Sequence, residues 1–154
     1  MASERLRRVV IGVGIAERGD DAAGRAVAQR LSGTLPGDVE IVECEGETTV
    51  LLARIEGASA VFVVDACVSG APPGTIRRFD ATEAPLPDLG ASVSTHDLGL
   101  AAAIELARAL GELPPRCIVY TIEGCSFEAG APLSPPVRRA VAEVARRLRA
   151  DVAR

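Results

Sequence analysis

The sequence predicts a three-layer α/β/α fold, in which helices cover both faces of a mostly parallel, twisted sheet of about five strands. Short apolar runs rich in Val and Ile alternate with helical patterns, and three of these runs are nearly continuous in apolar residues. Such runs are typical of strands buried on both faces. Strands that alternate with helices favour right-handed crossovers in an open, doubly wound sheet. The 154 residues show no linker and no internal repeat, so we expect a single domain spanning 1–154.

The predicted strands are four apolar runs and one more polar run. The polar run follows a Pro-Pro-Gly turn and is predicted as an extra, exposed edge strand. In chain order the five segments are residues 8–14, 39–43, 60–66, 74–81 and 117–123.

Helical patterns lie between the strands. The first helix is expected to start near Asp20 and Asp21, and the last near Ser134, because Ser followed by Pro marks a helix start. The helices are predicted at about residues 20–31, 48–56, 94–110 and 134–152. In the last one, a single apolar face repeats at helical spacing and comprises Val137, Val141, Val144, Leu148 and Val152.

Composition narrows the function classes. The formal net charge is -4, from 17 basic and 21 acidic residues, which argues against nucleic-acid binding through phosphate neutralisation. No apolar run approaches the roughly 20 residues needed to span a bilayer, and the N-terminus lacks the pattern of a signal peptide. The four cysteines form no C-x-x-C pair, so we expect a cytoplasmic protein with reduced thiols and no membrane partner.

Ligands of doubly wound sheets bind beyond the carboxyl ends of the strands. Three polar residues are predicted at that edge: Asp21 after the first strand, Asp65 at the end of the third, and His96 at the start of a helix. Each has a structural alternative. Asp20 or Asp21 could cap the first helix, Asp65 could form a turn, and His96 could be incidental beside a capping Ser or Thr.

Two carboxylates and one imidazole make a three-ligand set that suits zinc or nickel and leaves coordination positions open. A helix N-terminus favours the neutral imidazole that a metal requires. Two other interpretations are weaker. Gly12 and Gly14 begin a dinucleotide-binding pattern, but Glu17 stands where its third glycine belongs. Cys67 could approach His96 as a nucleophile, without any recognisable local signature.

Four segments together resemble the hydrogenase maturation proteases, the endopeptidases that finish the large subunit of nickel–iron hydrogenases. These are GVG followed by GDDAAG (12–24), VFVVDACVSGAPPGTI (61–76), STHDLGL (94–100) and IEGCSFEAGAPLSPPV (122–137). The resemblance covers about residues 8–150.

The resemblance implies that Asp21, Asp65 and His96 are both the metal-contacting and the catalytic positions. It implies a partner, the precursor of a hydrogenase large subunit, and a metal, nickel, which the precursor supplies. The implied reaction removes a C-terminal extension from that precursor, and a monomer is expected.

The chain departs from the family pattern at Ile15, Glu17 and the segment from Glu123 to Phe127, and Glu45 lies in another altered loop. Glu17 is a candidate fourth ligand. Two alternatives to the protease remain: a hydrolase that holds its own zinc on the same residues, and a module that recognises a metal-loaded partner without cutting it.

Overall fold

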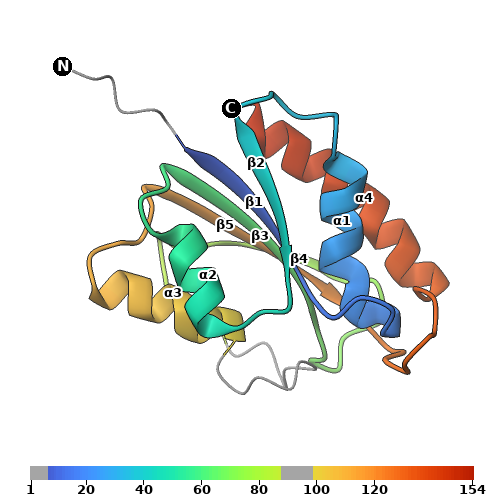
Figure 1. The fold of residues 1–154 in the computed structure, drawn as a ribbon. Helices are drawn as coiled ribbons and strands as arrows, with labels where there is room; N and C mark the ends of the chain where they lie inside the picture. The colour runs from blue at the N-terminus through green and yellow to red at the C-terminus, as the bar shows by residue number, and fades with distance from the viewer. Residues whose placement is uncertain (1–6, 88–98) are drawn as a thin grey trace.

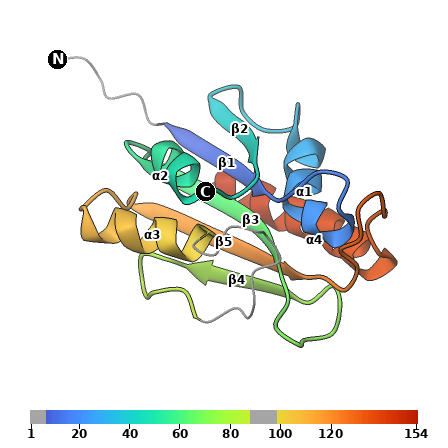
Figure 2. The ribbon, with the colours of Figure 1, turned by 60° about the horizontal axis from the view of Figure 1, so that its bottom comes forward.

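The computed structural model describes residues 7–87 and 99–154. Within them, five strands form one sheet in the order β2-β1-β3-β5-β4. This order can be followed across the sheet in Figure 2. β1, β2, β3 and β5 run parallel, and β4 pairs antiparallel with β5 at one edge. The strands are β1 Arg8–Val13, β2 Val39–Cys44, β3 Ala60–Cys67, β4 Ile76–Asp80 and β5 Arg116–Glu123. The predicted parallel sheet and its polar edge strand are both confirmed.

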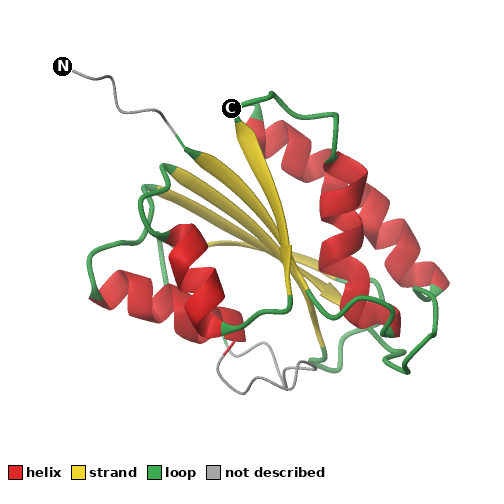
Figure 3. Ribbon diagram, viewed as in Figure 1, coloured by secondary structure: helices red, strands yellow, loops and turns green. Residues whose placement is uncertain are grey.

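Helices cover both faces of this sheet (Figures 1 and 3). The helices α1 and α4 pack on one face, and α2 and α3 pack on the other. Their bounds are α1 Ala23–Leu31, α2 Thr48–Ile55, α3 Gly99–Ala109 and α4 Pro135–Val152, and a short 3-10 helix, η1, spans Gly19–Ala22. The three-layer α/β/α prediction is therefore confirmed. None of the helices described is both long and apolar enough to span a membrane.

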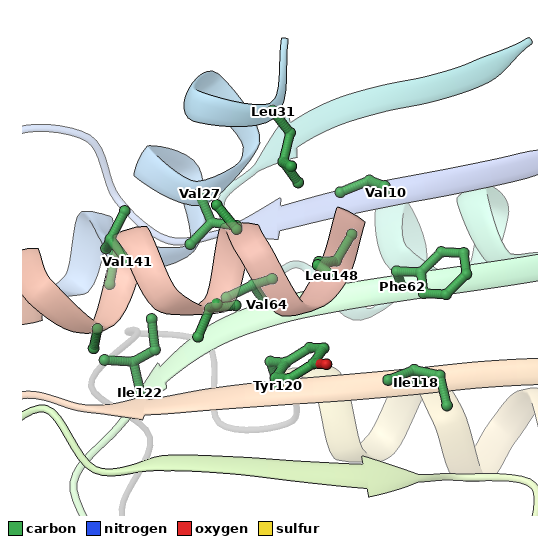
Figure 4. Close-up of a cluster of buried hydrophobic side chains, with 14 of the residues drawn as sticks. Val10, Val27, Leu31, Phe62, Val64, Ile118, Tyr120, Ile122, Val141 and Leu148 are labelled. Atoms are coloured by element: carbon green, nitrogen blue, oxygen red, sulfur yellow. The ribbon is translucent and has the colours of Figure 1, made fainter. Parts of the chain in front are cut away.

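Two apolar clusters hold the layers together. The first lies between the sheet and helices α1 and α4 (Figure 4), where Phe62 and Tyr120 are the largest fully buried side chains. The predicted apolar face of α4 lies in this cluster. The second lies under α2 and α3 and is built from smaller aliphatic residues. Each fully buried Val, Leu or Ile side chain contributes about 1.5–3 kcal/mol to the stability of the fold, because its apolar surface is removed from water.

The start of the first helix differs from the prediction, and the start of the third cannot be compared with it. The first helix begins at Ala23, and residues Gly19–Ala22 form the tighter η1 instead. Neither Asp20 nor Asp21 makes a side-chain cap on η1 or α1, because both carboxylates accept hydrogen bonds from other segments. The predicted start of the third helix, including Ser94 and His96, lies outside the described residues.

Candidate functional site at the carboxyl edge of the sheet

The loop that follows β1 brings η1 back over the end of that strand, and glycines make this possible. A Cβ on Gly14 would lie 1.9 Å from the carbonyl oxygen of Asp21. A Cβ on Gly24 would lie 2.3 Å from the Val64 carbonyl oxygen and 2.5 Å from that of Val13. The G-x-G and D-D-x-x-G spacing therefore serves close contact between helix and sheet. It places Asp21 at the carboxyl ends of β1 and β3.

Asp20 is fully buried and anchors a distant loop. Its Oδ1 accepts a hydrogen bond from the Ser134 N–H at 2.7 Å. Its Oδ2 accepts three more, from the N–H groups of Cys125 and Ser126 and from the Ser134 hydroxyl. Burial opposes ionisation of this carboxyl, but the hydrogen bonds outweigh it and hold the pKa of Asp20 below its ordinary value. Asp20 thus fastens residues 124–134 beside η1, and it has a structural task.

Asp21 shares none of the hydrogen-bond donors that Asp20 has among the described residues. It is 2% exposed, and its Oδ2 accepts a hydrogen bond from the Ile15 N–H at 2.9 Å. Its negative charge reaches Asp65 at the end of β3. Asp21 and Asp65, two of the three residues predicted from the sequence, therefore interact through their charges.

Asp65 is half-buried, and its Oδ1 accepts a hydrogen bond from the Ala66 N–H at 2.8 Å. Burial is the main cause that raises the pKa of Asp65 to about 7, and the charge of Asp21 raises it further, against the Ala66 hydrogen bond. Two carboxyl groups whose charges interact disfavour being ionised together, and a shared proton or a bound cation relieves this repulsion. The pair is therefore suited to contact a metal ion.

The third predicted residue, His96, lies outside the described residues. Within residues 7–87 and 99–154, the structure holds no group of three or more His, Cys, Asp or Glu side chains placed to bind a metal. The metal-contacting set of Asp21, Asp65 and His96 therefore stays a prediction in all three members.

Another buried carboxylate, Glu123, ends β5 at the same edge. Its two oxygens accept hydrogen bonds from the Ser69 N–H at 2.8 Å and the Ser69 hydroxyl at 2.5 Å. The Cys67 thiol also donates to it, at 3.5 Å. Burial opposes ionisation, but the Ser69 hydrogen bonds outweigh it and hold the pKa of Glu123 below its ordinary value. Glu123 thus holds the start of the loop between β3 and β4 in place.

Cys67 does not fit the nucleophile hypothesis. Burial, followed by the charge of Glu123, raises the pKa of the Cys67 thiol to about 11. A cysteine attacks as the thiolate, so a thiol with this pKa is a poor nucleophile at neutral pH.

Glu17, the candidate fourth ligand, faces a different space. It lines a cavity of about 590 Å³ formed by the 16–19 loop, α1 and residues 130–133. Neither Asp21 nor Asp65 lines that cavity. Glu17 also adopts a φ of 62°, and its carbonyl accepts a 2.6 Å hydrogen bond from the Gly130 N–H. Its role here is to join two loops.

Sequence reasoning missed the roles of Asp20 and Glu123. A signal for Glu123 existed, because it ends a buried strand as Asp65 does. For Asp20 the signal was absent, since its partners lie more than 100 positions away in the chain.

Comparisons with known proteins agree with the fold. Residues 26–150 match the family model described as HycI, hydrogenase maturation protease. The hydrogenase expression/formation protein HupD of Rhodobacter capsulatus is 30% identical over 154 residues, covering 94% of this chain and 72% of the relative. The hydrogenase 2 maturation protease of Escherichia coli K12 is 30% identical over 135 residues, covering 86% and 82%. The solved structure of the hydrogenase maturating endopeptidase HybD from E. coli superimposes with a TM-score of 0.80 at 29% identity, covering 96% and 92%.

Proposed function

The chain belongs to the hydrogenase maturation protease family, and on that premise we propose that it removes a C-terminal extension from the large-subunit precursor of a nickel–iron hydrogenase. In this proposal the nickel belongs to the precursor, so it is part of the substrate. Asp21, Asp65 and His96 contact it and so place the scissile peptide at the carboxyl edge of the sheet.

The juxtaposition of Asp21 and Asp65 is the observation that carries the proposal. Two close carboxyl groups repel each other when both are ionised, and this repulsion contributes to the raised pKa of Asp65. A divalent cation removes the repulsion and displaces the proton from Asp65. An imidazole from His96 would complete a set of oxygen and nitrogen ligands that suits nickel and leaves positions free for the precursor's own ligands.

The surrounding contacts support a site formed before the substrate arrives. The Ile15 N–H fixes one oxygen of Asp21, and the Ala66 N–H fixes one oxygen of Asp65. No described residue donates a hydrogen bond to the second oxygen of either carboxylate, which in this proposal contacts the metal. Ligands that are already oriented lose less conformational freedom on binding.

Co-expression with the cognate precursor tests the proposal. Mass spectrometry of the large subunit should show loss of a short C-terminal peptide when the wild-type chain is present. The variants Asp65→Asn and His96→Ala should leave the precursor intact. Processing at the wild-type level by both variants would refute the assignment of the site.

The metal content of the purified protein separates this proposal from a hydrolase with its own zinc. We expect no stoichiometric metal in the isolated chain, and one tightly held zinc per chain would favour the zinc hydrolase. A stable complex with an uncut, nickel-loaded precursor would favour the non-cleaving module.

A further inference from the structure

Thr121 lies beside Asp65 and carries a hydroxyl group that packing does not explain. The two residues are in register on β5 and β3, and Arg77 of β4 pairs with Thr121 on its other side. Thr121 is 1% exposed, and within the described part of the chain its Oγ1 has no hydrogen-bond partner.

The pleat places Thr121 on the same face of the sheet as Asp65. Val63 and Val119 both belong to the cluster under α2 and α3, and Asp65 and Thr121 follow them by two residues on their strands. Side chains two apart share a face, and neighbouring strands are about 4.8 Å apart. The Thr121 hydroxyl is therefore a close neighbour of the Asp65 carboxyl group.

A buried hydroxyl without a partner destabilises the fold, because water satisfies it in the unfolded chain. Valine has nearly the same shape and would fill this place without that penalty. The hydroxyl also lies near the Cys67 thiol and lowers its pKa, but the two groups do not meet hydrogen-bond geometry. The thiol donates to Glu123 instead.

We propose that Thr121 is a positioning residue for Asp65, and that its hydroxyl donates a hydrogen bond to the Asp65 carboxylate when the nickel of the precursor binds. In the free protein Asp65 is turned toward the Ala66 N–H, which occupies its Oδ1. The Ala66 N–H holds Oδ1, and a second donor, on the neighbouring strand, then fixes the direction of the carboxylate while it contacts the metal. Groups that orient a metal ligand in this way change metal affinity or activity by about 10- to 100-fold when removed.

This inference rests on the proposed function and is tested with the purified chain and its nickel-loaded precursor. Thr121→Val removes the hydroxyl and keeps the shape, and Thr121→Ser keeps the hydroxyl. We expect Thr121→Val to raise KM for the loaded precursor about 10-fold or more, with kcat within about twofold of wild type. Its thermal midpoint should equal or exceed that of the wild type. Thr121→Ser should restore KM, and binding of nickel-free precursor should be the same in all three proteins.

Wild-type KM in Thr121→Val would overturn the inference while leaving the protease assignment intact. Equal losses in Thr121→Val and Thr121→Ser, or a lowered thermal midpoint in Thr121→Val, would make the residue a packing element and also overturn it. If the wild-type chain does not cut the loaded precursor, the proposed function fails, and the inference fails with it.

Discussion

Asp20 and Asp21 are adjacent in the chain, yet their carboxylates serve different parts of the molecule. Asp20 accepts four hydrogen bonds from Cys125, Ser126 and Ser134. Asp21 accepts one from Ile15, and its charge raises the pKa of Asp65. The tight turn of η1 separates them, so one residue fastens a loop while its neighbour stays available for a ligand.

These separate roles predict different effects for substitutions at the two positions, one on stability and one on processing. Asp20→Ala removes four hydrogen bonds from a buried position and should lower the free energy of unfolding by about 2–4 kcal/mol. Asp21→Asn keeps an oxygen that can accept from Ile15, so stability should stay near the wild-type value while processing is lost. Urea denaturation and a cleavage assay measure the two effects. A stable Asp20→Ala variant would mean that residues 124–134 do not depend on this anchor.

The close contact between α1 and the sheet makes a further prediction. Gly24→Ala would force a Cβ to within 2.3 Å of the Val64 carbonyl oxygen, so it should destabilise the fold by about 3 kcal/mol and displace Asp21. Gly37→Ala is the matched control, because a Cβ there meets nothing within 4 Å. Equal thermal midpoints for the two variants would contradict the close-packing explanation of the glycine pattern.

Much of the fold follows from patterns within short segments. Continuous Val-rich runs predict the buried parallel strands, and the spacing from Val137 to Val152 predicts the buried face of α4. The same reasoning predicts which chain segments meet at the carboxyl edge, and hence Asp21 and Asp65. It could not separate Asp20 from Asp21, because helix capping explains either acid locally. The same reasoning could not identify the unpaired Thr121 hydroxyl, because the neighbours of a buried group are known only from the tertiary structure.

A buried carboxylate far from the site should govern acid stability. Asp151 accepts hydrogen bonds from Arg78 and from the Tyr120 hydroxyl, and it lies 3.8 Å from Arg116. Burial opposes its ionisation, but these partners outweigh it and lower the pKa of Asp151. A carboxyl group with a lowered pKa stabilises the fold above its unfolded-state pKa of about 3.8. That contribution is lost as the pH falls through the folded-state value.

Asp151→Asn should therefore lower stability by about 3 kcal/mol at pH 7, and the difference from the wild type should shrink as the pH falls below about 4. Denaturation curves at several pH values measure this. Glu143→Gln is the control, because Glu143 pairs with Arg146 and Arg147 on the exposed side of α4 and should contribute little. A constant difference between Asp151→Asn and the wild type across pH would argue against the ion pair as the cause.

Thiol labelling tests the conclusion that Cys67 is not a catalytic nucleophile. At pH 8, iodoacetamide should modify the exposed Cys125 first, because burial raises the pKa of both Cys67 and Cys117 to about 11. Mass spectrometry of the peptides gives the order of labelling. Cys67→Ser should also keep its processing activity. Rapid labelling of Cys67 together with loss of processing in Cys67→Ser would restore the nucleophile hypothesis.

Cleavage of purified precursor with and without its nickel tests the central claim most directly. If Asp21 and Asp65 bind the nickel of the substrate, the wild-type chain should cut the nickel-loaded precursor and leave the nickel-free form intact. The Asp21→Asn variant should cut neither form. Equal cleavage of the loaded and nickel-free forms by the wild-type chain would contradict the account, because the carboxylate pair would then have no metal to recognise.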